Sequence, residues 1–201
     1  MPGVLFEGGS FRAIFSCGVM DALLDQDVMF PYCIGVSAGA ADSASYISRQ
    51  KERNLNMLLR YRNDKRYMGL RNYFKKEHSL FGVDFVFRKM PNVLFPFDMD
   101  TFQNYAGDYV VVTTDANTGK PHYFHKEDVD DRFDVICASC ALPVYFQAVH
   151  IGGGAYYDGG VSDPVPIRRL QRDGHHKALI VLTRPEGYRK ACGRSDRFAA
   201  G

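Results

Sequence analysis

The chain has 201 residues, of which 46% are hydrophobic and 24% charged, so it is a globular protein with enough apolar residues for one sizeable core. Its formal net charge of +2 is too small to indicate a nucleic-acid partner. No stretch approaches the roughly 18 consecutive apolar residues that a membrane span requires, which leaves only peripheral contact with a membrane.

The N-terminal part repeats one local pattern of strand, glycine turn and helix. A short apolar run at residues 4–6 precedes Gly8 and Gly9, and apolar residues then recur at helical spacing over residues 13–24. A second apolar run covers residues 32–36, and the small residues at 38–41 that follow Ser37 can start a tightly packed helix. We therefore expect two strand–turn–helix units.

The next segment is basic and then aromatic. Residues 49–76 hold ten Lys or Arg against Glu52 and Asp64, so this segment is either a solvated helical face or a surface that attracts anionic lipids. The prolines Pro91 and Pro96 interrupt the aromatic stretch, so we expect it to form irregular cover over an apolar region. The phenylalanines of this stretch are Phe81, Phe85, Phe87, Phe95, Phe97 and Phe102.

The C-terminal half adds further strands. Residues 109–113, 122–124 and 177–183 are rich in β-branched or aromatic residues, and a turn at 115–119 makes the first two a hairpin. Strands that alternate with helices predict an α/β fold of three layers, α/β/α, with a mainly parallel central sheet. Such sheets bind ligands at the carboxyl ends of their strands, where both glycine turns lie.

The cysteines give no framework for disulfides or metal. There are five, and Cys137 and Cys140 form one C-x-x-C without a second pair, so we expect them to pack in the core and predict no metal site. The N-terminus lacks the charged start and long apolar run of a signal peptide, which favours a cytoplasmic location.

Residues 35–39 match the G-x-S-x-G pattern of a nucleophile elbow, between an apolar strand and a small-residue helix. On such a sharp turn a strained backbone pushes the hydroxyl of Ser37 outward, and Gly35 and Gly39 remove side chains that would collide with neighbouring elements. The start of the following helix favours negative charge. Ser37 is therefore the candidate nucleophile.

The turn from Gly8 to Arg12 occupies the matching position after the first strand. Its small residues free backbone N–H groups to point into a cavity, where they can hold an oxyanion. A phosphate site is the other use of such a turn, but neither of the glycine-rich nucleotide motifs is present, so no cofactor is expected.

A third glycine-rich cluster, at residues 151–160, surrounds Asp158. Asp-Gly is a common surface turn, so this cluster by itself allows either a turn or a functional carboxylate.

Three blocks in this order and spacing resemble the motif blocks of the patatin-like phospholipases, in particular the bacterial single-domain members. The blocks are residues 7–13 (Glu-Gly-Gly-Ser-Phe-Arg-Ala), residues 35–39 (Gly-Val-Ser-Ala-Gly) and residues 158–160 (Asp-Gly-Gly). Residues 114–119 and 138–143 also resemble family segments, and the resemblance covers roughly residues 4–182. It implies a patatin-type α/β/α fold, a Ser-Asp dyad, and hydrolysis of acyl esters, typically of lipids.

Carried over by position, the resemblance implies Ser37 as nucleophile, Asp158 as its base, and an oxyanion hole at Gly8, Gly9 and Ser10 with Arg12 steadying the loop. Ser10 stands where the family usually has a third glycine, and Ala13 where it usually has another. A serine at position 10 is expected to keep the backbone donor only with a negative φ. Family domains usually run further, so the resemblance implies one domain over residues 1–190, cut short, with a frayed tail at 191–201.

Two other readings stay open at this stage. An α/β-hydrolase triad would use Ser37, Asp158 and then His175 or His176, which is the correct chain order, although these histidines lie in what looks like an exposed turn. The two missing glycines and the short C-terminus support a binding protein that keeps the fold without activity, whereas the intact Ser37 and Asp158 argue against it. The oligomeric state cannot be predicted from these patterns.

Overall fold

The computed structural model describes residues 1–67, 69, 72, 79 and 82–189, so the tail expected at 191–201 lies outside the described residues. Within them, one seven-stranded sheet has the pairing path β5-β6-β3-β2-β1-β7, and β4 also pairs with β3. The strands are β1 (Gly3–Phe6), β2 (Tyr32–Val36), β3 (Asp108–Asp115), β4 (Pro121–His125), β5 (Val149–Ile151), β6 (Gly154–Asp158) and β7 (Ala178–Val181).

Strands β7, β1, β2 and β3 are parallel, while β4, β5 and β6 are antiparallel to their neighbours. The predicted α/β fold with a mainly parallel central sheet is therefore confirmed.

The helices are α1 (Ile14–Asp25), α2 (Ala38–Ile47), α3 (Arg53–Tyr61), η2 (Phe85–Leu94), α5 (Met99–Gln103), α6 (Asp134–Cys140) and α7 (Ile167–Arg172), with short turns η1 (Ser10–Ala13), η3 (Lys126–Asp128) and η4 (Gly159–Val161).

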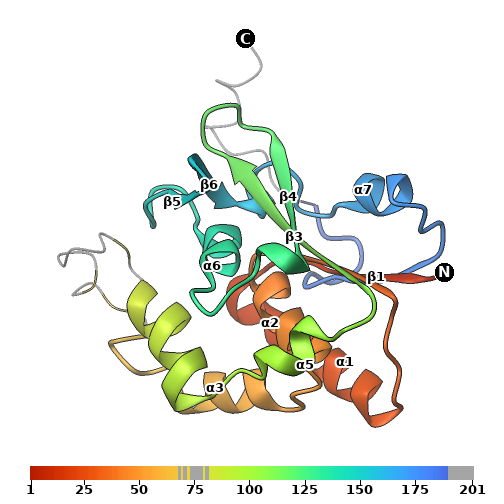
Figure 1. The fold of residues 1–201 in the computed structure, drawn as a ribbon, viewed down its shortest axis with the longest axis horizontal. Coiled ribbons are helices and arrows are strands. Elements are labelled where there is room, and N and C mark those ends of the chain that lie inside the picture. The colour runs from red at the N-terminus through yellow and green to blue at the C-terminus, as the bar shows by residue number, and fades with distance from the viewer. Residues whose placement is uncertain (68, 70–71, 73–78, 80–81, 190–201) are drawn as a thin grey trace.

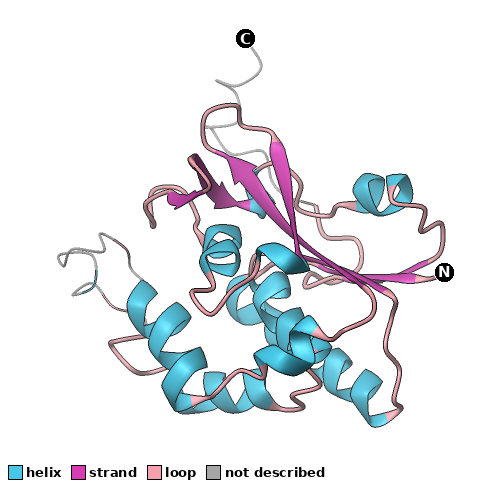
Figure 2. Ribbon diagram, in the orientation of Figure 1, coloured by secondary structure: helices cyan, strands magenta, loops and turns pink. Residues whose placement is uncertain are grey.

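Side chains alternate between the two faces of the sheet, as the strand pleat requires. One face packs against α1, α2, α5 and α6, and α7 covers the other (Figure 1; Figure 2 shows the same view by secondary structure). The face toward α2 carries Val4, Phe6, Cys33, Tyr109 and Val111. The face toward α7 carries Leu5, Ile34, Val36, Val110 and Val112.

The layer on the α7 side is thin. In the described part of the chain, Leu170 is the buried residue that α7 adds to the core on this side. Leu179 and Ile180 of the edge strand β7 remain 37% exposed. The expected cover on both faces is thus complete only over the central strands.

The prediction of irregular structure for the aromatic stretch is wrong for its middle part. Residues Phe85–Leu94 form η2, a helix of the wide π type that contains Pro91, and α5 follows. Pro91 argues against a regular helix by itself, but Phe85, Phe87 and Met90 are buried, and this packing outweighs the local preference. Phe81 lies outside the described residues.

Candidate active site

Ser37 lies on a sharp turn between β2 and α2, with φ 54° and ψ −127°, a backbone conformation that L residues rarely adopt. The flanking glycines make the turn sterically allowed. A Cβ on Gly35 would lie 2.5 Å from the Cα of Ala40, and one on Gly39 would lie 2.3 Å from the carbonyl oxygen of Phe6. Neither position therefore tolerates a side chain, and the strand, turn and helix pack as the G-x-S-x-G pattern predicts.

The buried Ser139 of α6 ties this turn to the sheet. The backbone N–H of Ser37 donates to Ser139 Oγ at 2.9 Å, and Ser139 Oγ donates to the carbonyl oxygen of Val112 at 2.7 Å. Sequence reasoning assigned no role to Ser139, because one serine in a helix gives no sign of a partner about a hundred residues away. Its place in residues 138–143, which resemble a family segment, was the available sign.

Strand register brings Asp158 to Ser37. Two strands pair with the same side of β3, one after the other. The last residue of β2, Val36, lies opposite Val112, and the last residue of β6, Asp158, lies opposite the next residue of β3, Thr113. β4 pairs along both stretches and so occupies the other side of β3. Because β2 runs parallel to β3 and β6 runs antiparallel, their carboxyl ends face each other, and Ser37 meets Asp158 there.

The two side chains are hydrogen-bonded. Ser37 Oγ donates to Asp158 Oδ2 at 2.7 Å, and the N–H of Gly160 donates to Asp158 Oδ1 at 2.8 Å, so each carboxylate oxygen has a partner. Thr114 Oγ1 donates to the carbonyl oxygen of Asp158 at 2.8 Å and holds its backbone. Asp158 is only 2% exposed, so its carboxylate is fixed against the serine.

Burial raises the pKa of Asp158 from 3.8 to about 6, while the hydrogen bonds from Ser37 and the Gly160 N–H act in the opposite direction. At neutral pH the group is still mainly ionised. It is a stronger base than an exposed aspartate, which general-base chemistry at an alcohol requires.

The first glycine turn lies directly against Ser37. A Cβ on Gly8 would lie 2.8 Å from the Cβ of Ser37. Thr183, which follows β7, holds this turn in place. Its backbone N–H donates to Glu7 Oε2 at 2.5 Å, and its hydroxyl donates to the carbonyl oxygen of Gly8 at 2.8 Å. Glu7 and Thr183 were not predicted to take part in this arrangement.

The N–H groups of Gly9 and Ser10 make no hydrogen bond within the described residues, so they are available to a ligand. A Cβ on Gly9 would lie 3.2 Å from Arg12 Nη2, which places the guanidinium of Arg12 beside the turn. The backbone N–H of Arg12 closes the turn by donating to the carbonyl oxygen of Gly9 at 3.0 Å.

The condition that the sequence set for the backbone donor at Ser10, a negative φ, is not met. Its φ is 49°, in the left-handed region, which costs a non-glycine residue about 1–2 kcal/mol. The loop thus keeps the backbone shape that a glycine would adopt without strain, because Gly8, Thr183 and Arg12 hold it on either side.

This strain makes a prediction for position 10. Ser10→Gly should keep ester turnover and change the free energy of unfolding by no more than about 1 kcal/mol, because relief of strain and the added freedom of the unfolded chain offset each other. Ser10→Val, with a branched Cβ, should lower both turnover and melting temperature. Thermal melts and kcat/KM on a soluble ester test this, and a fully active, equally stable Val variant would contradict it.

Two hollows meet at Ser37. An apolar pocket of about 110 Å³ extends between α2, α3 and η2, and its lining includes Ser37, Met57, Leu58, Phe87 and Phe146. A more open cleft of about 590 Å³ is lined by Gly8, Gly9, Arg12, Asp158 and Val161. Ser10, Ser37 and Leu142 line both, so the serine stands between an apolar pocket and a polar cleft.

The sequence profile of the family described as "Patatin-like phospholipase" matches residues 4–170. The chain belongs to this family.

A relative and a solved structure show similarity to this patatin-like chain. YjjU of Escherichia coli (strain K12), described as an uncharacterized protein, is 29% identical over 186 residues, which cover 89% of this chain and 51% of YjjU. The chain therefore spans about half the length of this relative. VipD from Legionella pneumophila, a crystal structure, is similar with 15% identity and a TM-score of 0.44, over 81% of this chain and 46% of that chain.

The histidines of the alternative triad lie elsewhere in the patatin-like fold. His175 Nδ1 is 2.9 Å from the carbonyl oxygen of Met1, and its ring stacks on Tyr32 with centroids 4.2 Å apart. Met1 precedes β1 and Tyr32 begins β2, so His175 lies at the amino ends of the strands. Ser37 follows the carboxyl end of β2. The strand length separates them, and the adjacent His176 is exposed.

The described cysteines of this patatin-like domain lie in the core or at its edge. Cys17, Cys33 and Cys137 are buried, and Cys140 lines the pocket beside Ser37. Burial raises the pKa of Cys140 well above its usual value, so its thiol stays neutral and is a poor nucleophile. Among the described residues, no group of three or more His, Cys, Asp or Glu side chains could hold a metal ion.

Proposed function

We propose that this patatin-like chain is a serine acyl hydrolase that cleaves acyl esters of lipids, with Ser37 as nucleophile and Asp158 as general base. The observation that carries the proposal is the hydrogen bond of 2.7 Å from Ser37 Oγ to a buried carboxylate. A hydroxyl that donates to a base of raised pKa, on a strained elbow, is the arrangement that nucleophilic catalysis needs.

In the first half-reaction, Ser37 Oγ attacks the ester carbonyl carbon while its proton passes to Asp158 Oδ2. The carbonyl oxygen becomes an oxyanion, which the N–H groups of Gly9 and Ser10 stabilise, and the positive charge of Arg12 lies beside them. The intermediate collapses to an acyl-serine, and the departing alcohol takes the proton from Asp158. Water then repeats both steps on the acyl-serine and releases the acid.

The two hollows suit the two parts of a lipid ester. The apolar pocket lined by Met57, Leu58, Phe87 and Phe146 accepts the acyl chain, because burying each methylene there contributes about 0.8 kcal/mol. The open cleft with Arg12 accepts the alcohol part, which carries the head group in a phospholipid.

A chromogenic short-chain ester and a fluorophosphonate probe test the proposed function. We expect the wild type to hydrolyse the ester and the probe to modify Ser37, as located by peptide mass spectrometry. Modification of another serine, or no turnover of any ester by folded protein, would refute the assignment, and the second result would favour a fold kept for binding.

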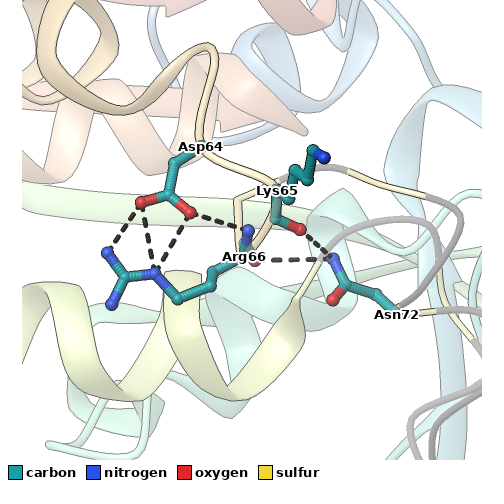
Figure 3. Close-up of polar contacts among 4 residues, drawn as sticks. All are labelled: Asp64, Lys65, Arg66 and Asn72. Atoms are coloured by element: carbon teal, nitrogen blue, oxygen red, sulfur yellow. Dashed lines mark hydrogen bonds and ion pairs between the residues drawn. The ribbon is translucent and has the colours of Figure 1, made fainter.

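We also propose that residues 49–76 attract the protein to anionic membranes. Three of the basic residues are engaged in ion pairs: Arg49 with Asp27, Lys51 with Asp25, and Arg66 with Asp64, the last drawn in Figure 3. The basic residues left exposed on and after α3 are Arg60, Arg62 and Lys65, next to the acyl pocket that α3 lines. Arg71, Lys75 and Lys76 lie outside the described residues.

Salt should separate this attraction from catalysis. Added salt should lower activity on anionic vesicles about tenfold or more and leave activity on a soluble ester unchanged, because each basic residue near an anionic surface contributes about 1 kcal/mol. Replacing Arg60, Arg62 and Lys65 by Gln should reproduce the loss at low salt. Replacing the ion-paired Arg49 and Lys51 by Gln should lower activity on anionic vesicles less. Equal salt dependence on both substrates would make the segment a plain solvated face.

In the part of the chain that the structure describes, no helix combines the length and apolar character needed to cross a bilayer.

A further inference from the structure

A second buried carboxylate lies along the apolar pocket. Asp42, on α2 one and a half turns after Ser37, is 8% exposed and lines the pocket at the nucleophile. It also lines an adjoining pocket of about 60 Å³. The two pockets share Ala41, Met57, Val86 and Phe87, so they form one apolar route that leads away from Ser37 past Asp42.

Among the described residues, the Asp42 carboxylate has two favourable neighbours, the thiol of Cys17 and the positive charge of Arg53. Its carboxylate accepts a hydrogen bond from the thiol of Cys17, and thiols are weak donors. An ionised carboxylate has about four acceptor sites, so most of its capacity is unused. Burial raises the pKa of Asp42 to about 7, which expresses the cost of keeping this charge away from water.

The far pocket also contains an unused donor. Arg53 of α3 donates from Nη1 to Ser45 Oγ at 3.1 Å and from Nη2 to the carbonyl oxygen of Phe95 at 2.7 Å. Its Nε–H is buried and has no hydrogen-bond partner among the described residues. The guanidinium lies over the ring of Phe97, 5.3 Å from its centroid, so the side chain is held in place and lines the pocket with Asp42.

Neither group belongs to the proposed acyl-transfer machinery. An unsatisfied buried polar group costs about 1–3 kcal/mol, and an apolar pair would fill an acyl pocket better. The charges also limit what fits: a ligand carboxylate would be repelled by Asp42, and an ammonium group by Arg53. A neutral group that both donates and accepts satisfies the two residues together, and a hydroxyl is the smallest such group.

We propose that Asp42 and Arg53 form a polar subsite in the acyl pocket, so that the substrate is an ester whose acyl chain carries a hydroxyl group. The hydroxyl donates to the Asp42 carboxylate and accepts from Arg53 Nε–H. This inference rests on the proposed hydrolase function and specifies the class of its acyl group.

Matched chromogenic esters test the subsite. Plain alkanoates are compared with terminally hydroxylated alkanoates of equal length, over a series of lengths, because the hydroxyl must reach Asp42. At one length the wild type should favour the hydroxylated ester in kcat/KM by about tenfold or more, as expected when the plain chain leaves buried polar groups unpaired. No preference at any length would overturn the proposal.

Three variants assign the preference to these residues. Asp42→Leu should remove it and raise turnover of the plain ester, whereas Asp42→Asn, which still accepts through its amide oxygen, should keep part of it. Arg53→Met should reduce it. The control Asp25→Leu changes an exposed, ion-paired aspartate of α1 and should leave it intact. Circular dichroism and thermal melts confirm folding, and an unchanged preference in Asp42→Leu would refute the role of Asp42.

A binding measurement separates failure of the subsite from failure of the hydrolase. Ser37→Ala is loaded with an apolar fluorescent dye, which is displaced by alkanols or by alkanediols of equal length. Better displacement by a diol, lost in Ser37→Ala with Asp42→Leu, supports the subsite even if no ester is hydrolysed. Equal displacement at every length, with hydrolysis of plain esters intact, would overturn the subsite and leave the hydrolase standing.

Discussion

Replacing Ser37 by alanine should reduce ester hydrolysis by about 10⁴-fold or more, to near the background rate, without unfolding the chain. The change removes the Oγ atom that attacks the carbonyl carbon in the proposed mechanism. It keeps a Cβ at the elbow, where the positive φ of 54° is already accommodated and the Ser37 N–H still donates to Ser139. Turnover of a chromogenic ester and circular dichroism measure the two parts of this expectation.

The matched control is Ser43→Ala, a buried serine on the same helix whose hydroxyl donates to the carbonyl oxygen of Ala40. It should keep most of the turnover and remain reactive with a fluorophosphonate. Unchanged turnover in Ser37→Ala would exclude Ser37 as nucleophile.

Replacing Asp158 by asparagine should lower turnover by about 10²–10⁴-fold, the usual contribution of a general base. The amide keeps the size of the side chain and an oxygen that can accept from Gly160, but it cannot take the proton of Ser37. In the wild type, kcat/KM should fall as pH drops below about 6, because protonated Asp158 cannot act as a base. A normal rate in the variant would remove Asp158 from the mechanism.

The same substitution should stabilise the fold near neutral pH. The pKa of Asp158 is about 6 in the folded state against an ordinary value of 3.8, so the folded chain binds the proton more tightly. Stability then falls as pH rises from about 4 to about 6, by an amount on the order of 3 kcal/mol. The Asp158→Asn variant has no ionisable group at this position and does not lose this stability. Its gain in melting temperature over the wild type should therefore be larger at pH 7 than at pH 4. An equal gain at both would show that the buried charge is not its source.

The histidine pair provides the control for the base. His175→Ala combined with His176→Ala should keep most of the turnover, because His175 packs at the amino ends of β1 and β2. Loss of activity as complete as in Ser37→Ala, in folded protein, would replace the dyad by a triad.

Local sequence determined the parts of the site that depend on local sterics. Gly35, Ser37 and Gly39 predicted the elbow, because a sharp strand-to-helix turn admits no side chain on either flank, and the structure shows those contacts at Ala40 and Phe6. The strand and helix periods likewise predicted the boundaries of β1, α1 and β2 to within about a residue or two. In the aromatic stretch Pro91 favoured irregular structure, and non-local packing of Phe85 and Met90 produced a helix instead.

The tertiary structure decided which distant residues meet. Asp158 reaches Ser37 because β2 and β6 pair end to end along β3, and Ser139 holds the elbow from α6. Asp42 and Arg53 come to line one pocket only when α2 and α3 pack together. Strand register and helix packing are set by the sum of many weak non-local contacts, whereas a motif expresses only the backbone conformation of its own few residues. The sequence by itself therefore identified the candidate residues and their local turns, and the fold decided their partners.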